Sequence, residues 1–125
     1  MDVRRVLLVD DEDDIRRIGE ISLVHVGGFE VSMASSGAEA LELAVSERPD
    51  VILLDVMMPG LDGPSTLAAL RADARTASIP VVFLTAKVQR QEVERYRSLG
   101  ALGVIAKPFD PMALPEAVRA LLRGA

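Results

Sequence analysis

The chain contains no cysteine and no tryptophan, and its 125 residues include only three Phe and one Tyr. Without cysteine, disulfide frameworks, cysteine-ligated zinc and thiol nucleophiles are all excluded. Because aromatic residues are scarce, the core must consist of Val, Leu, Ile, Ala and Met. A chain of this length buries roughly two-thirds of its unfolded surface, so it needs no disulfide or structural metal to fold.

Long apolar runs and an excess of positive charge are also missing. No stretch approaches the ~18 apolar residues of a membrane span, and the first ten residues hold too short an apolar run for a signal peptide. The 19 acidic residues outnumber the 14 basic ones, and the net charge of -5 is a poor match for nucleic acid. We therefore expect one soluble, cytoplasmic domain over residues 1–125 that binds neither membranes nor nucleic acid directly.

Short apolar runs alternate with segments of helical periodicity along the chain. The apolar runs, which predict strands, lie at residues 6–9, 29–33, 51–54, 81–84 and 102–106. Helices are predicted over about residues 13–26, from 36 through 44, from 64 through 70, and over 89–99 and 115–122. This alternation predicts an α/β fold, a doubly wound parallel sheet with five strands and five flanking helices. In such a sheet, ligands bind at the carboxyl ends of the strands.

Polar residues follow four of the predicted strands. Asp10 and Asp11 follow the first strand, Asp55 the third, Thr85 the fourth and Lys107 the fifth. Each has an ordinary structural explanation when taken alone, such as an acidic first helical turn or a surface lysine. Together, three carboxylates at one sheet edge need a proton or a cation to coexist, and Lys107 is the only cation predicted beside them. Hard oxygen ligands favour Mg²⁺ over a transition metal.

Four segments carry a resemblance to a known family. They are Val9–Glu12, Leu54–Gly63, Leu84–Ala86 and Ala106–Phe109. In residues, order and spacing they resemble the receiver (CheY-like) domain of two-component response regulators, and the likeness covers essentially the whole chain. The resemblance implies a flavodoxin-like sheet with strand order 2-1-3-4-5.

The resemblance implies a phosphorylation site that depends on Mg²⁺. Asp55 would be the phosphoacceptor, since an aspartate can act as a nucleophile and form an acyl phosphate. Asp11 and Asp55 would ligate the metal through their side chains, Asp10 through a water molecule, and Met57 through its backbone carbonyl. The protein would be a signalling switch rather than a conventional enzyme, and would catalyse only its own phosphorylation and dephosphorylation.

The resemblance also implies how the phosphoryl group is held and read. Thr85, Ala86 and Lys107 would contact it and form the switch, and the peptide bond before Pro108 would be cis. Many receivers carry Tyr or Phe three residues before this lysine, as a rotamer switch. The residue here is Val104, which has no ring to move, so an aromatic readout on this face is not implied.

The expected phosphoryl donor is a histidine kinase or a histidine phosphotransfer protein, and the downstream target is a protein that the sequence does not identify. Ile15, Ile18, Pro108 and Phe109 are predicted to form an apolar partner surface beside the active-site edge. We expect a stand-alone receiver without an effector domain. The alternative is a receiver excised from a longer regulator or a hybrid kinase.

A third interpretation is a Mg²⁺-dependent phosphohydrolase that uses Asp55 as its nucleophile. Haloacid-dehalogenase enzymes place a second acid two residues after that aspartate, but Met57 occupies the position here, so no general acid is available. Nearby, Gly60 and Gly63 are predicted to serve turn geometry, because no Walker-type Gly-Lys-Ser/Thr follows them.

Overall fold

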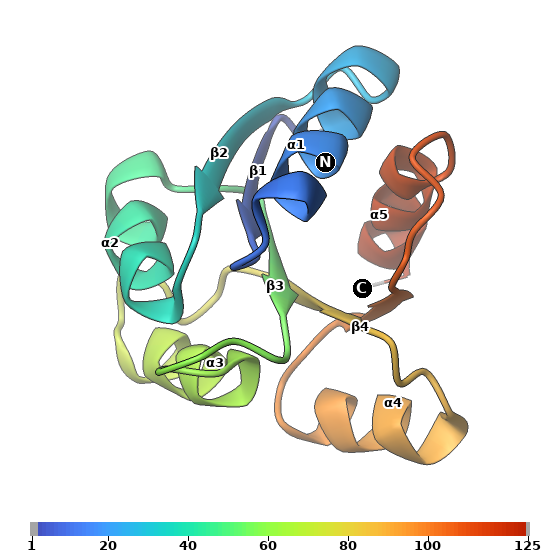
Figure 1. Cartoon of the computed structure of the whole chain (residues 1–125). Helices are drawn as coiled ribbons and strands as arrows, with labels where there is room; N and C mark the ends of the chain where they lie inside the picture. Colours follow the sequence, from blue (N-terminus) through green and yellow to red (C-terminus); the bar gives the residue numbers. More distant parts are fainter. Residues whose placement is uncertain (1–2, 125) are drawn as a thin grey trace.

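The computed structural model describes residues 3–124. One parallel sheet contains the strands β1 (Arg5–Val9), β2 (Glu30–Ala34), β3 (Val51–Asp55), β4 (Val81–Thr85) and β5 (Gly103–Ala106). The helices are α1 (Asp13–Ile21), η1 (Ser22–Val26), α2 (Gly37–Glu47), α3 (Gly63–Ala72), α4 (Arg90–Ser98) and α5 (Leu114–Arg123). The strands lie in the order β2-β1-β3-β4-β5, which confirms the predicted doubly wound fold and its strand order (Figure 1). Within residues 3–124, every helix is too short or too polar to cross a bilayer.

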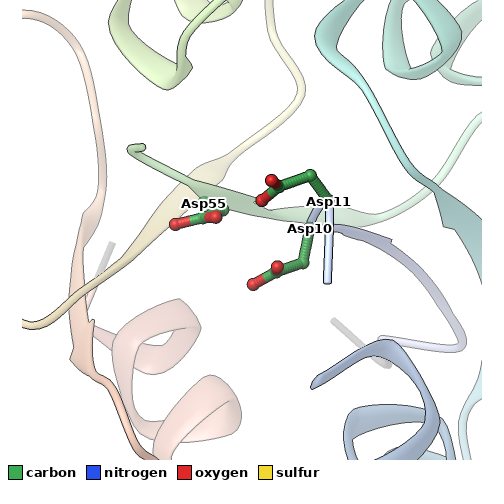
Figure 2. A group of neighbouring side chains, drawn as sticks. All are labelled: Asp10, Asp11 and Asp55. Carbon is green, nitrogen blue, oxygen red and sulfur yellow. The ribbon is translucent and has the colours of Figure 1, made fainter. Parts of the chain in front are cut away.

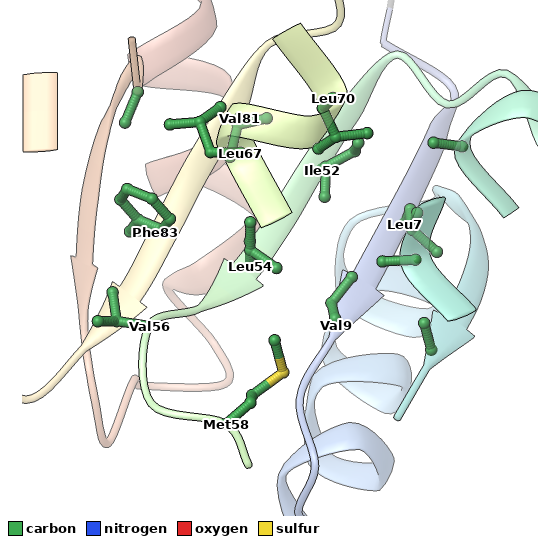
Figure 3. Packing of buried hydrophobic residues seen from close by; sticks show 14 of the residues in the cluster. Leu7, Val9, Ile52, Leu54, Val56, Met58, Leu67, Leu70, Val81 and Phe83 are labelled. Atoms are coloured by element: carbon green, nitrogen blue, oxygen red, sulfur yellow. The ribbon is translucent and has the colours of Figure 1, made fainter. Parts of the chain in front are cut away.

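Helices cover both faces of the sheet, which explains why its central strands are apolar throughout. On one face, Leu8 and Leu53 pack in a cluster with residues of η1 and α5. On the other face, Leu7 and Leu54 pack in a cluster with residues of α2, α3 and α4 (Figure 3). β3 and β4 are buried along their whole length, so the residues that end these strands start from a rigid framework.

The helix predicted over residues 13–26 is present, but its last turn is π-helical. In this turn, η1, the Gly27 amide donates to the Ser22 carbonyl at 3.1 Å, five residues back. The Ser22 side chain is buried and donates to the Pro111 carbonyl, which ties η1 to the segment before α5. The wider turn therefore coincides with a tertiary contact, which the apolar periodicity of the sequence does not predict.

The segment between β3 and α3 folds back onto the end of β3. Gly60 has a φ of +72° and open space around it, which confirms its predicted role in a turn. For Gly63 that prediction is wrong, because a Cβ there would lie 2.6 Å from the Asp55 carbonyl oxygen. Gly63 therefore serves close packing, and α3 begins there, one residue before the predicted Pro64, because the Asp62 side chain accepts the Ser65 amide at 2.8 Å.

Candidate functional site

Three carboxylates lie together at the carboxyl ends of β1 and β3 (Figure 2). Asp10, Asp11 and Asp55 each offer an oxygen within 4.8 Å of the others. Asp10 is fully buried and Asp55 is 3% exposed, whereas Asp11 is exposed. They meet because β1 and β3 are adjacent parallel strands, with Val9 paired to Leu54 just before the site. The site is therefore half closed by protein and half open to solvent at Asp11.

Lys107 supplies a positive charge to this group from the end of β5. Its Nζ donates to Asp10 Oδ2 at 2.8 Å and lies 3.4 Å from Asp55 Oδ1 and 4.0 Å from Glu12 Oε1. Burial lowers the pKa of Lys107, but the hydrogen bond and charge of Asp10, with help from Asp55, outweigh it and hold the pKa above its ordinary value. The lysine is thus a permanent cation. The peptide bond that follows it, Lys107–Pro108, is cis.

The surroundings of Asp55 disfavour the charged form of its carboxyl group. Burial, and then the charge of Asp10, raise its pKa from 3.8 to about 6, against the opposing effects of Lys107 and the Met57 amide. That amide donates to Asp55 Oδ1 at 3.3 Å. One cation does not balance the crowded negative charge, and the arrangement favours the arrival of a further cation.

The site suits Mg²⁺. Its donors are hard carboxylate oxygens on three residues, and one of those residues faces solvent, so an incoming ion would keep part of its water shell. Asp10, Asp11 and Asp55 could together hold such an ion. Both carboxylate oxygens of Asp10 already have protein partners, because Oδ2 accepts Lys107 Nζ and Oδ1 accepts the Glu12 amide at 2.9 Å.

Thr85 and Ala86 lie at the end of β4, the strand next to β3. Thr85 is buried, and its hydroxyl oxygen accepts the Lys87 amide at 3.0 Å. Ala86 is exposed beside it. Across the sheet, the Lys107 amide donates to the Thr85 carbonyl at 2.9 Å, so the ends of β4 and β5 are joined. The structure thus brings the predicted threonine and lysine to the same edge as the carboxylates.

Met57 and Val104 differ in their surroundings. Met57 is 77% exposed at the mouth of the site, so its thioether makes little contact with the protein. Val104 is half-buried, pairs with Phe83 across the sheet and packs against the cluster that faces α2, α3 and α4. The position that carries a mobile ring in many receivers is therefore filled here by a small, packed side chain.

The residues predicted as a partner surface gather beside the site. Phe109 follows the Lys107–Pro108 bond, and a Cβ built on Gly19 would lie 3.6 Å from its ring, so Phe109 lies against α1. Ile18 precedes Gly19 and is 43% exposed, and Ile15 lies one turn earlier and is half-buried. Pro108 is exposed. Together these residues form a partly apolar strip along α1 and the β5–α5 segment.

Arg16 is a residue of this region that the sequence interpretation missed. Its Nη1 donates to the Asp10 backbone carbonyl at 2.6 Å, and its Nη2 pairs with Asp13 Oδ1. Arg16 forms its ion pair with Asp13 and meets the site only at its backbone, so within residues 3–124 Lys107 is the cation that pairs with Asp10 and Asp55. The spacing of Asp13 and Arg16 could have indicated their ion pair. No sequence pattern indicates the contact between Arg16 and the Asp10 carbonyl, because that contact depends on the path of the chain from β1 into α1.

The comparisons with known proteins agree with this fold. A structure of the chemotaxis response regulator CheY4 of Vibrio cholerae superposes with a TM-score of 0.88 at 32% identity, over 96% of this chain and 99% of that one. The architecture is thus that of a CheY-like receiver. The chain also matches the family described as the response regulator receiver domain over residues 6–119, and it belongs to that family.

Curated relatives extend beyond this chain. A probable transcriptional regulator, ycf27, of Guillardia theta is 43% identical over 119 residues, which are 95% of this chain and 45% of that protein. The DNA-binding dual master transcriptional regulator RpaA of Synechocystis is 41% identical over 119 residues, 95% of this chain and 49% of that protein. The chain thus spans about half the length of the curated relatives that it matches.

Proposed function

We propose that this receiver domain accepts a phosphoryl group on Asp55, with Mg²⁺ bound at Asp10, Asp11 and Asp55. The observation that carries the proposal is the meeting of these carboxylates with Lys107 at one sheet edge, within hydrogen-bonding and ion-pair distance. The phosphorylated domain then acts as a protein-binding switch or as an intermediate in a phosphorelay. Its donor is a histidine kinase or a histidine phosphotransfer protein, and its place of action is the cytoplasm.

In the proposed reaction, a carboxylate oxygen of Asp55 attacks the phosphorus atom of phosphohistidine. An O–P bond forms, the P–N bond breaks, and the imidazole leaves with the electron pair. Asp55 has to be ionised for this attack, and its pKa of about 6 leaves it mostly ionised at neutral pH. Bound Mg²⁺ would neutralise charge on the phosphoryl oxygens. The ammonium of Lys107 lies 3.4 Å from Asp55 Oδ1 and is placed to pair with the same oxygens.

Other residues of the edge receive the phosphoryl group once it is attached. The Thr85 hydroxyl, which accepts the Lys87 amide, can turn and donate its proton to a phosphoryl oxygen. The Met57 carbonyl is the proposed backbone ligand of the metal, and Ala86, being small, leaves room beside the phosphoryl group. The switch is then read without an aromatic rotamer, because Val104 is packed in place.

The output of the switch depends on what the domain is joined to. RpaA is described as DNA-binding, and this chain matches only 49% of that protein. A receiver of a longer regulator, or of a hybrid kinase, is therefore as compatible with the sequence as a stand-alone one. In each case the part of the chain described here supplies the phosphorylation site, and the direct contact with nucleic acid lies elsewhere.

Incubation with acetyl phosphate, which needs no partner protein, tests the proposal. With Mg²⁺, intact-mass spectrometry should show a gain of one phosphoryl group per chain, and the gain should disappear in EDTA. Asp55→Asn is the decisive variant, and Asp14→Asn is its matched control, because Asp14 is an exposed acid outside the carboxylate group. Labelling of Asp55→Asn at the natural level would refute Asp55 as the acceptor. Continuous turnover of acetyl phosphate without a labelled protein would instead indicate the phosphohydrolase.

A further inference from the structure

The end of β1 is joined to the first turn of α1 by a side chain that ordinary helix capping does not explain. Glu12, at the N-cap of α1, makes no side-chain capping bond. Instead, Arg16 reaches back across one turn of α1 with two nitrogens. Nη1 donates to the Asp10 carbonyl at 2.6 Å, and Nη2 pairs with Asp13. The side chain is 18% exposed, so a guanidinium is largely withdrawn from water to make these two contacts.

The Asp10 carbonyl belongs to the peptide plane that joins Asp10 to Asp11. Asp10 is already fixed at its other atoms. Its amide donates to the Ala34 carbonyl at 3.1 Å, Oδ1 accepts the Glu12 amide, and Oδ2 accepts Lys107 Nζ. Asp11 is exposed, and its direction depends on the peptide plane before it. The bond from Arg16 is the side-chain contact that sets that plane.

We infer that Arg16 is a positioning residue for the Mg²⁺ site, which holds the Asp10–Asp11 peptide so that the Asp11 carboxylate faces Asp55. The inference rests on the proposed function, since it concerns the metal site placed there. Arg16 does not touch the ion. It acts through the Asp10 carbonyl, and the ion pair with Asp13 keeps the guanidinium in the orientation that this bond requires.

The charge of Arg16, taken alone, would have the opposite effect on Mg²⁺ affinity. A positive charge near a cation site repels the cation, so its removal should strengthen Mg²⁺ binding if charge is all that matters. If Arg16 positions Asp11, its removal should weaken binding instead. Loss of a group that orients a metal ligand costs about 10-fold or more in affinity. The sign of the change therefore separates the two explanations.

The experiment measures the Mg²⁺ dissociation constant of the full chain by isothermal titration calorimetry. We expect Arg16→Ala to bind about 10-fold more weakly than the natural protein. Arg17→Ala is the matched control, because it removes the same charge from an exposed neighbour on the same helix, and it should bind as tightly as the natural protein or slightly more tightly. Arg16→Lys keeps the charge and the aliphatic stem but not the planar fork, so it should also bind weakly.

A second measurement does not involve the metal. In EDTA, the backbone amide resonance of Asp11 in ¹H–¹⁵N spectra should shift in Arg16→Lys and stay in place in Arg17→Ala. Tight Mg²⁺ binding by Arg16→Ala or Arg16→Lys, or an unmoved Asp11 resonance, would overturn the inference and leave the proposed function intact. Failure of the natural protein to bind Mg²⁺ would overturn both.

Discussion

Replacing Asp55 with Asn should stabilise the metal-free protein at neutral pH. Asp55 and Asp10 are both buried, and Lys107 contributes one positive charge between them. The raised pKa of Asp55 means that folding disfavours its ionised form. Asparagine has nearly the same shape and still offers an oxygen to the Met57 amide, but it carries no charge.

The size of the effect follows from the change in pKa. One pKa unit corresponds to about 1.4 kcal/mol, so the rise from 3.8 to about 6 corresponds to about 3 kcal/mol. Because folding raises this pKa, protonated Asp55 contributes fully to the stability of the folded protein below pH 3.8. That contribution to the free energy of unfolding is lost as the pH rises through about 6 and Asp55 ionises. The advantage of Asp55→Asn should thus be near zero at low pH and reach about 3 kcal/mol at neutral pH. At about 3 °C per kcal/mol, the melting temperature should rise by roughly 10 °C.

The assay is thermal unfolding followed by circular dichroism, in EDTA and at several pH values between about 4 and 7.5. Asp11→Asn is the comparison variant, and because Asp11 is exposed, its effect in EDTA should be smaller. Mg²⁺ at 100 times its dissociation constant should stabilise the natural protein by about 2.7 kcal/mol, and both variants should lose most of this gain. A melting temperature of Asp55→Asn that is lower than that of the natural protein in EDTA, or an advantage that does not vary with pH, would refute the reasoning.

Three further predictions concern the surroundings of Asp55. Ile15→Asp should slow phosphotransfer from a histidine phosphotransfer protein and leave acetyl-phosphate labelling unchanged, because Ile15 lies on the partly apolar strip beside the site. Equal transfer rates for the variant and the natural protein would show that this surface does not bind the donor. Met57→Asn should shorten the lifetime of the acyl phosphate, because the amide of asparagine can orient a water molecule whereas the thioether of methionine cannot. A radiolabel decay assay in which the natural protein loses phosphate faster than the variant would contradict this. Lys107→Met should destabilise the protein in EDTA by about 3 kcal/mol, because it leaves buried Asp10 without its cation, and chemical denaturation at pH 7 measures the loss.

The sequence predicted the fold through features that are local and periodic. Apolar runs mark all five strands to within a residue or two, most clearly β3 and β4, which are buried along their whole length. The carboxylates and the lysine could be grouped in advance for a related reason. Parallel strands end at the same edge of the sheet. The strand order therefore predicts that three residues at strand ends lie near one another: Asp10, Asp55 and Lys107.

Contacts between distant backbone atoms and side chains could not be predicted in this way. The bond from Arg16 to the Asp10 carbonyl depends on the path by which the chain leaves β1, and no residue pattern encodes that path. The hydrogen bond from Ser22, in the π-helical turn, to Pro111 joins residues 89 positions apart. Gly63 looked like a turn residue, yet what requires glycine there is the closeness of the Asp55 carbonyl. Each of these features is set by tertiary packing rather than by the sequence around it.

The pairing of Lys107 with Asp10 has a consequence for how the site comes into existence. These residues are 97 positions apart, at the ends of β5 and β1, with β3 and β4 lying between them in the sheet. Such distant pairs close late in folding, because the entropy of a long loop has to be lost before the contact forms. A chain in which β5 has not joined the sheet therefore lacks the contacts of Lys107 with Asp10 and Asp55. Under the proposed function, a chain phosphorylated at Asp55 would therefore be one in which all five strands had joined the sheet.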